Sequence, residues 1–239
     1  MKLKTILLGL LVALASMAVD AQTVMIVPKK TIHQRPRPEY DLKKTFSIRS
    51  PIAKASTSDL SQKITAAISP VKVLEINLKE EMGEFQWLEE ADYKVLFNQQ
   101  GVLCVELWMT GTAAYPDSVN KTVVVDIAKG MRVSVSDVLT DLDKLAPLVK
   151  KKQHAEVLAA TKAMKKDPDA DPKALFSETN FTTEDFSEFA VDAKGVTFIY
   201  DYGFPHVLEA LQPSGKYHFT WAELKPFVRS DGLLARFVR

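Results

Sequence analysis

The sequence YKVLFNQQGVLCVELWM, from Tyr93 to Met109, carries the clearest structural signal in the chain. Two apolar runs, Tyr93–Phe97 and Val102–Met109, flank a short polar loop that ends in Gly101. Aromatic and β-branched residues favour strands, and a short Gly-containing loop between two such runs is typical of a β-hairpin. The sequence therefore predicts two antiparallel strands here.

Strand patterns continue on both sides of this hairpin. Each has apolar residues that recur at every second position or in a short run, which indicates a strand with one or both faces covered. They comprise Val71–Leu78, Val119–Ile127, Met131–Val135 after a turn at Ala128–Gly130, and the pair Phe186–Val191 and Val196–Tyr202 around a turn at Asp192–Gly195. We expect an antiparallel meander from these segments.

Helix signals occur in blocks between the strands. Ser58 is expected to cap a short helix that Pro70 stops, and the Ala-, Leu- and Lys-rich segment Leu148–Lys166 predicts a long helix with Pro147 in its first turn. Thr220 with Glu223 forms a capping box that opens a short helix near the C-terminus. Blocks of strands and helices favour the α+β class, with mostly antiparallel sheets built from hairpins packed against the long central helix and the short C-terminal helix.

The two N-terminal segments, 1–21 and 22–55, differ in composition from the rest of the chain. Residues 1–21 combine Lys2 and Lys4, an apolar run and small residues before a cut after Ala21, which is the layout of a signal peptide. We therefore expect a periplasmic or secreted protein without a transmembrane anchor after cleavage. Residues 22–55 are rich in Pro and basic residues and predict an extended arm. The cluster of basic residues there suits either a solvated linker or attachment to an anionic polymer or membrane surface. We place the folded body at 56–239, with halves 56–140 and 141–239.

Composition excludes several classes of function. With 46% hydrophobic residues in 239, the chain can bury a core and is not wholly disordered. Its formal net charge of +1 gives no cationic excess for a phosphate backbone, so we expect no nucleic-acid partner. Its single cysteine, Cys104, can make neither an internal disulfide nor a thiolate cage, and its apolar neighbours indicate a core position.

Titratable residues show no strong catalytic or metal pattern, and we expect no cofactor. The histidines match no metal-binding spacing, although His206 and His218 lie on the two sides of one loop. They support an alternative, a metal-dependent hydrolase acting on envelope polysaccharide. A calcium-loop spacing of carboxylates, Asp167, Asp169, Asp171 and Glu178, has Pro172 where positive φ is required, so it favours a helix exit.

Aromatic side chains are the more informative pattern. Phe198, Tyr200, Tyr202 and Phe204 alternate along one predicted strand and its exit, and Tyr217 follows nearby. Spacing by two places such side chains on one face. They either pack a sheet against the last helix or, because tyrosine is stiff and amphipathic, border a recognition surface for protein or glycan.

The order of motifs over Val71–Val238 resembles the RsiV-like extracytoplasmic domain family, the domain pair also found in PdaC-type peptidoglycan deacetylases. The resemblance is carried by Gly195-Val-Thr-Phe-Ile-Tyr200, a loop to Gly215, and Thr220-Trp-Ala-Glu-Leu-Lys-Pro-Phe-Val228. Upstream, Gly111-Thr-Ala-Ala-Tyr-Pro116 and Ser134-Val-Ser-Asp-Val-Leu139 resemble the family's Gly-Ala-His-Pro loop and the run that follows it. Tyr115 stands where relatives carry His, which puts any role of an imidazole there in doubt.

The resemblance implies an exported α+β domain that acts as a sensor portion or binding module, without established catalysis of its own. Together with the aromatic pattern it predicts a non-catalytic module of the cell envelope that engages a cell-wall glycan or an extracellular protein. The candidate ligand-binding residues lie in the loop after Gly111 and at the tyrosine-bearing C-terminal edge. They are Tyr115, Pro116, Asp117, Tyr200, Tyr202, His206 and Tyr217.

Overall fold

The computed structural model describes residues 23–165 and 170–238, which form two compact units. The N-terminal unit comprises the described residues up to Lys121 together with Val125–Arg132, and the C-terminal unit comprises Thr122–Val124 and the chain from Val133. The expected signal peptide, 1–21, lies outside the described residues. Within them, none of the helices has the length and apolarity that crossing a bilayer requires.

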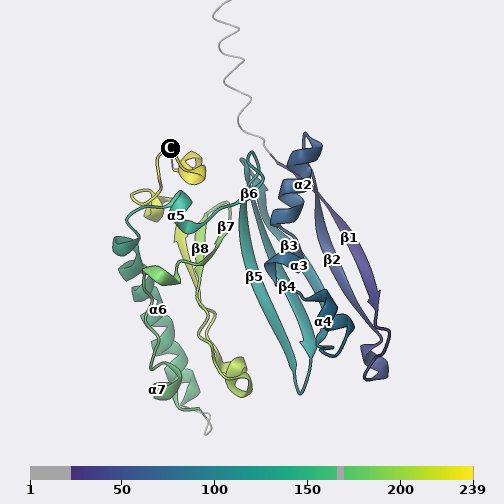
Figure 1. Cartoon of the computed structure of the whole chain (residues 1–239). Coiled ribbons are helices and arrows are strands. Elements are labelled where there is room, and N and C mark those ends of the chain that lie inside the picture. The colour runs from purple at the N-terminus through teal and green to yellow at the C-terminus, as the bar shows by residue number, and fades with distance from the viewer. Residues whose placement is uncertain (1–22, 166–169, 239) are drawn as a thin grey trace, which may run out of the picture. The chain divides into compact units, whose positions relative to one another are not determined.

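The N-terminal unit is built on a six-stranded sheet in which the strand order follows the sequence (Figure 1). Its strands are β1 (Met25–Gln34), β2 (Thr45–Lys54), β3 (Leu88–Gln99), β4 (Val102–Thr112), β5 (Pro116–Asp126) and β6 (Met131–Arg132). The pair β2–β3 is parallel and covers only Ser47–Glu90 and Ile48–Ala91, so the expected meander is interrupted once. Phe46, Leu88 and Leu103 are among the side chains that fill the core beneath this sheet.

Residues 25–54 form strands β1 and β2, so the prediction of an extended arm outside the body is wrong for them. Pro28 lies directly opposite Pro51 in the antiparallel pair. The Ala53 N–H, two residues beyond Pro51, points away from β1, because it donates to Thr65 Oγ1 at 3.0 Å. N–H groups two residues apart in a strand point to the same side, so the nitrogen of Pro51 also faces away from β1. The N–H that proline lacks would therefore not have bonded to β1, and no hydrogen bond between the strands is lost. The prolines are therefore compatible with pairing.

The predicted hairpin at Tyr93–Met109 is confirmed as β3 and β4. Gln100 and Gly101 form its two-residue loop with φ of 51° and 75°, the positive values that a tight hairpin turn of this twist needs. Cys104, on β4, is fully buried, as its apolar neighbours indicated.

Short helices cover part of this sheet. The predicted helix after Ser56 is present as α2 (Ser58–Ala67), although its N-cap is Thr57. The strand expected at Val71–Leu78 is absent: α3 (Pro70–Val73) and α4 (Leu78–Met82) occupy this segment, and η1 (Asp41–Lys43) lies between β1 and β2. Pro70 occupies the first turn of α3, and the Asn77 side chain accepts from the Glu80 N–H at the start of α4, so both helix starts have a local cause.

The C-terminal unit combines a three-stranded antiparallel sheet, in the order β7-β8-β9, with helices. Its strands are β7 (Glu188–Val191), β8 (Gly195–Ile199) and β9 (Lys216–Thr220), which confirms the second hairpin. Its helices are α5 (Val135–Val138), α6 (Leu142–Met164), α7 (Pro172–Leu175) and α8 (Trp221–Leu224), with 3-10 turns η2 (Thr183–Asp185), η3 (His206–Leu211) and η4 (Leu233–Phe237).

Two predicted boundaries in this region are corrected. The strand expected at Met131–Val135 ends at Arg132, because Ser134 and Asp137 form a capping box that opens α5. The long helix begins at Leu142, so Pro147 lies inside it instead of in the first turn. The capping box of Thr220 and Glu223 is present as predicted, and the fold class α+β is confirmed.

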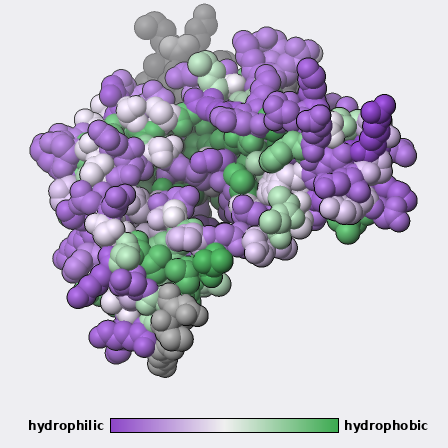
Figure 2. Space-filling view, turned by 60° about the horizontal axis from the view of Figure 1, so that its bottom comes forward, coloured by the Kyte–Doolittle hydropathy of each residue, from purple (hydrophilic) through white to green (hydrophobic). Residues whose placement is uncertain are grey.

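The long helix α6 is anchored to the three-stranded sheet by Lys152. Its ammonium donates to the carbonyl of His218, lies 3.9 Å from the centroid of the Phe219 ring and is 3.5 Å from Glu223 Oε1. Phe198, Phe219 and Val149 are buried between the two layers. On the face shown in Figure 2, hydrophilic residues predominate and hydrophobic ones gather in patches between them.

Candidate functional site

The aromatic alternation divides into a buried part and an open part. Phe198, on β8, is fully buried and packs edge-on against Phe186 and Phe219. β8 ends at Ile199, so Tyr200 and Tyr202 follow the strand. Their rings contact each other edge-on at 5.1 Å. Phe198 therefore serves packing, while a recognition surface at Tyr200 and Tyr202 stays a prediction.

The backbone of Tyr200 lies in close contact with Gly215. The Tyr200 N–H donates to the Gly215 carbonyl at 2.8 Å, which continues the β8–β9 ladder by one bond. Gly215 has φ of 62°, and a Cβ at this position would lie 1.9 Å from the Tyr200 carbonyl oxygen. Only glycine fits both the close approach and the left-handed conformation. The side chain of Tyr200 is therefore placed by the sheet.

A hydrogen-bonded cluster fixes Tyr202. Its hydroxyl lies 2.7 Å from the Tyr217 hydroxyl, and both hydroxyls lie 3.0 Å from Glu156 Oε2 on α6. Ser214 donates to the other oxygen, Glu156 Oε1, at 2.6 Å. One carboxylate thus accepts from side chains of the loops on both sides of η3, which restricts the orientation of the Tyr202 ring.

The tyrosine hydroxyls remain protonated. Burial raises the pKa of Tyr202 and of Tyr217 well above the usual value of 10, and the nearby Glu156 carboxylate raises both further. Burial likewise raises the pKa of Tyr200. At neutral pH these hydroxyls are therefore neutral hydrogen-bonding groups and are not nucleophiles or general bases.

Tyr200 and Tyr202 border an open pocket of about 470 Å³ between the α7 region and the loop before η3. The pocket joins aromatic and polar side chains. Its lining comprises Ala174, Leu175, Ser177, Glu178, Thr179, Tyr200, Tyr202, Gly203, Phe204 and Pro205. Phe176 supports it from behind, because its ring contacts those of Tyr202 and Phe204 at 5.6 and 5.3 Å. We call this site the tyrosine pocket.

The predicted site residues fall into two groups. Tyr200 and Tyr202 line the tyrosine pocket, Tyr217 bonds to Tyr202 behind it, and His206 follows the lining residue Pro205 at the start of η3. The other group, Tyr115 with Pro116 and Asp117, lies at the turn between β4 and β5 in the N-terminal unit. Tyr115 is 64% exposed. Its part in binding remains a separate prediction.

Several residues of the site carried no sequence signal. Glu156 is one of several polar residues on a helix, and nothing local marks it as the carboxylate that three hydroxyls approach. Phe176 has no local mark either, and Glu178 stands out only in the calcium-loop spacing, which does not point to the tyrosines. All three are brought to the tyrosines by tertiary structure alone.

Metal-ligating groupings are weak in the described part of the chain. Residues 23–165 and 170–238 contain no cluster of three or more His, Cys, Asp or Glu side chains that could hold a metal ion. His218 Nδ1 lies 3.2 Å from Thr197 Oγ1, its neighbour across β8 and β9. Asp171 caps α7 by accepting from the Lys173 N–H, while Asp167 and Asp169 lie outside the described residues.

Known proteins resemble this chain in fold and not closely in sequence. No protein-family model and no curated protein matches the sequence. The crystal structure of a DUF3298 family member from Bacteroides fragilis superposes with a TM-score of 0.59 at 13% identity, over 91% of this chain and 98% of that one. A DUF3298 family protein from Pseudomonas aeruginosa superposes with a TM-score of 0.59 at 14% identity, over 87% and 96%. At such identity the likeness shows the fold alone, and this chain has the fold of these DUF3298 structures.

Proposed function

We propose that this protein is a non-catalytic binding module of the cell envelope that recognises a cell-wall glycan at the tyrosine pocket. The observation that carries the proposal is the pocket itself, an open cavity whose walls present Tyr200, Tyr202 and Phe204 beside the polar side chains of Ser177 and Thr179. The expected signal peptide and the resemblance to an exported family support a place in the cell envelope.

The chemistry of this lining suits a saccharide. A sugar ring has an apolar face formed by its C–H groups and an edge of hydroxyls, so it binds where aromatic faces adjoin neutral donors and acceptors. The hydroxyl of Tyr202 is held in one orientation by Tyr217 and Glu156, which lowers the entropy lost on binding. The cluster therefore favours binding by a preformed site.

The same contacts argue for binding without hydrolysis. Glycoside hydrolysis by the common route needs two carboxyl groups that flank the scissile bond. Glu178 lines the pocket, but Glu156 lies within hydrogen-bonding distance of the hydroxyls of Tyr202, Tyr217 and Ser214, so its lone pairs serve the cluster. The raised pKa values of the tyrosines leave them without a role as nucleophiles.

Co-sedimentation with insoluble peptidoglycan tests the proposal. The purified protein is incubated with peptidoglycan sacculi, and the bound fraction is compared for the parent and for Tyr202→Ala and Tyr200→Ala. We expect each substitution to weaken binding at least about tenfold, because removing a central aromatic anchor costs about 1.4 kcal/mol or more.

Tyr40→Ala is the matched control, because Tyr40 is 60% exposed but belongs to the N-terminal unit. It should bind like the parent, and Tyr115→Ala tests the predicted loop in the same assay. Undiminished binding of both pocket variants would refute the site. If the protein does not bind sacculi but binds a defined extracellular protein, and Tyr202→Ala abolishes that binding, a glycan is refuted as the ligand.

A further inference from the structure

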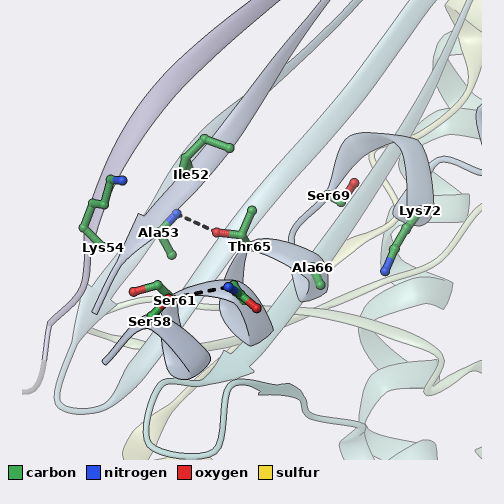
Figure 3. Close-up of a pocket in the computed structure, with 10 residues that line it drawn as sticks. Ile52, Ala53, Lys54, Ser58, Ser61, Thr65, Ala66, Ser69 and Lys72 are labelled. Atoms are coloured by element: carbon green, nitrogen blue, oxygen red, sulfur yellow. Dashed lines mark hydrogen bonds between the residues drawn. The ribbon is translucent and has the colours of Figure 1, made fainter. Parts of the chain in front are cut away.

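A second cavity lies in the N-terminal unit, where β2 separates from β3 (Figure 3). The parallel pairing of the two strands ends at Ile48 and Ala91, and α2 then lies beside the open edge of β2. The cavity has a volume of about 440 Å³. It is lined by Ile52, Ala53, Lys54, Ser58, Ser61, Gln62, Thr65, Ala66, Ser69 and Lys72, and we call it the lysine groove.

The floor of the lysine groove combines apolar and hydroxyl groups. Ile52 and Ala66 supply methyl groups, while Thr65 and Ser61 accept hydrogen bonds from the N–H groups of Ala53 and Ala55 at 3.0 and 2.9 Å. These bonds tie α2 to the edge of β2 and fix the positions of both hydroxyls. The Thr65 hydroxyl proton has no acceptor among the described residues, so it can donate to a ligand.

The charge at the lysine groove is of one sign. Figure 3 shows Lys54 on β2 and Lys72 on α3 at opposite ends of the floor. Neither has a carboxylate partner among the described residues, and no carboxylate lines the cavity. The acidic residue of α2, Asp59, is paired with Lys63 at 2.7 Å, and neither of these two lines the cavity.

From this arrangement we infer a second binding site, specific for a sugar that carries a phosphate or carboxylate group. The lysine at one end binds the anionic group, the lysine at the other end adds to the positive potential of the groove, and the apolar floor with the fixed hydroxyls accepts the ring. The charge complementarity selects the anionic ligand, and the size of the cavity fits one or two sugar rings. The site lies in a different unit from the tyrosine pocket and does not depend on the function proposed for it.

NMR titration of the purified protein with glucose 6-phosphate and with glucuronate tests this inference. We expect saturable shifts of the amide signals of Ala53, Thr65 and Ser69 with millimolar affinity, and no such shifts with glucose. Lys54→Met or Lys72→Met should weaken the affinity about threefold to fivefold, and the double variant about tenfold or more, since each lysine contributes one weak charge contact.

Lys63→Met is the matched control, because this lysine lies on α2 outside the cavity and should leave the titration unchanged. The inference fails if neither anionic sugar shifts these amides up to about 20 mM, a weak-binding limit. It fails equally if the double variant binds like the parent or if inorganic phosphate binds as tightly as glucose 6-phosphate. Shifts confined to Tyr200 and Tyr202 would overturn it while supporting the tyrosine pocket.

Discussion

Replacing Arg35 by Met should destabilise the N-terminal unit by about 3–5 kcal/mol, the usual cost of breaking a buried ion pair from one side. The side chain of Arg35 is fully buried and 3.0 Å from Glu81 Oε2. It also donates to the carbonyl oxygens of Glu81, Lys43 and Leu88 at 2.7 to 2.9 Å, and stacks on the Phe46 ring at 4.7 Å. Methionine would leave these acceptors buried without donors.

Urea unfolding followed by tryptophan fluorescence measures this loss. Trp87 and Trp108 lie in the N-terminal unit and Trp221 in the C-terminal unit, so a Trp221→Phe background reports the first unit alone. With a slope of about 2 kcal/mol per molar urea, we expect the midpoint to fall by about 2 M in Arg35→Met. Arg35→Lys keeps the positive charge but not the several N–H donors of the guanidinium, so its urea midpoint should lie between those of the parent and Arg35→Met.

Arg37→Met provides the control, because Arg37 is exposed and its side chain makes no hydrogen bond or ion pair with the described residues. It should stay within about 0.5 kcal/mol of the parent. If Arg35→Met also left the free energy of unfolding unchanged, Arg35 would be exposed to solvent, and the inclusion of residues 25–54 in the folded unit would be refuted.

Three further predictions concern other parts of the structure, and each is tested by urea unfolding. Burial raises the pKa of Tyr217 above 10, so its contribution to the free energy of unfolding is complete below about pH 10 and is lost as the pH rises further. Tyr217→Phe should reduce this loss of stability by up to about 1.4 kcal/mol per pH unit. An unchanged dependence of stability on pH would contradict the burial of Tyr217. Gly215→Ala places Cβ 1.9 Å from a carbonyl oxygen and should cost about 3 kcal/mol or more. Gly203→Ala, with the same φ of 62° but open space, should cost only about 1–2 kcal/mol, and equal losses would refute the close approach. Thr65→Val removes the acceptor of the Ala53 N–H and should cost about 1–3 kcal/mol, with Thr65→Ser milder; a silent Thr65→Val would contradict that bond.

Local patterns predicted the elements whose causes are local. The hairpin at Tyr93–Met109 needs only two apolar runs and a turn that tolerates positive φ, all adjacent in sequence. The capping box of Thr220 and Glu223 is likewise complete within four residues. Asn77 with Glu80 is a similar signal, and it would have identified α4 where the alternation of apolar residues favoured a strand.

Features that depend on register or on tertiary contacts were not predictable from one sequence. Pro28 and Pro51 indicated an unpaired arm, and only their placement opposite each other in the ladder makes both compatible with a sheet. The alternation identified Tyr200 and Tyr202, but Glu156 lies 46 residues before Tyr202 and has no local mark. The sequence therefore pointed to the tyrosines of the candidate site but not to the carboxylate that orients Tyr202.

Glycan recognition at the tyrosine pocket is tested by an NMR titration of the purified protein with a soluble glycan fragment of peptidoglycan. We expect saturable shifts at the residues that line the tyrosine pocket, within 174–179 and 200–205, and their loss in Tyr202→Ala. A fragment that binds the protein without shifting these residues, or no binding of glycan at all, would contradict it.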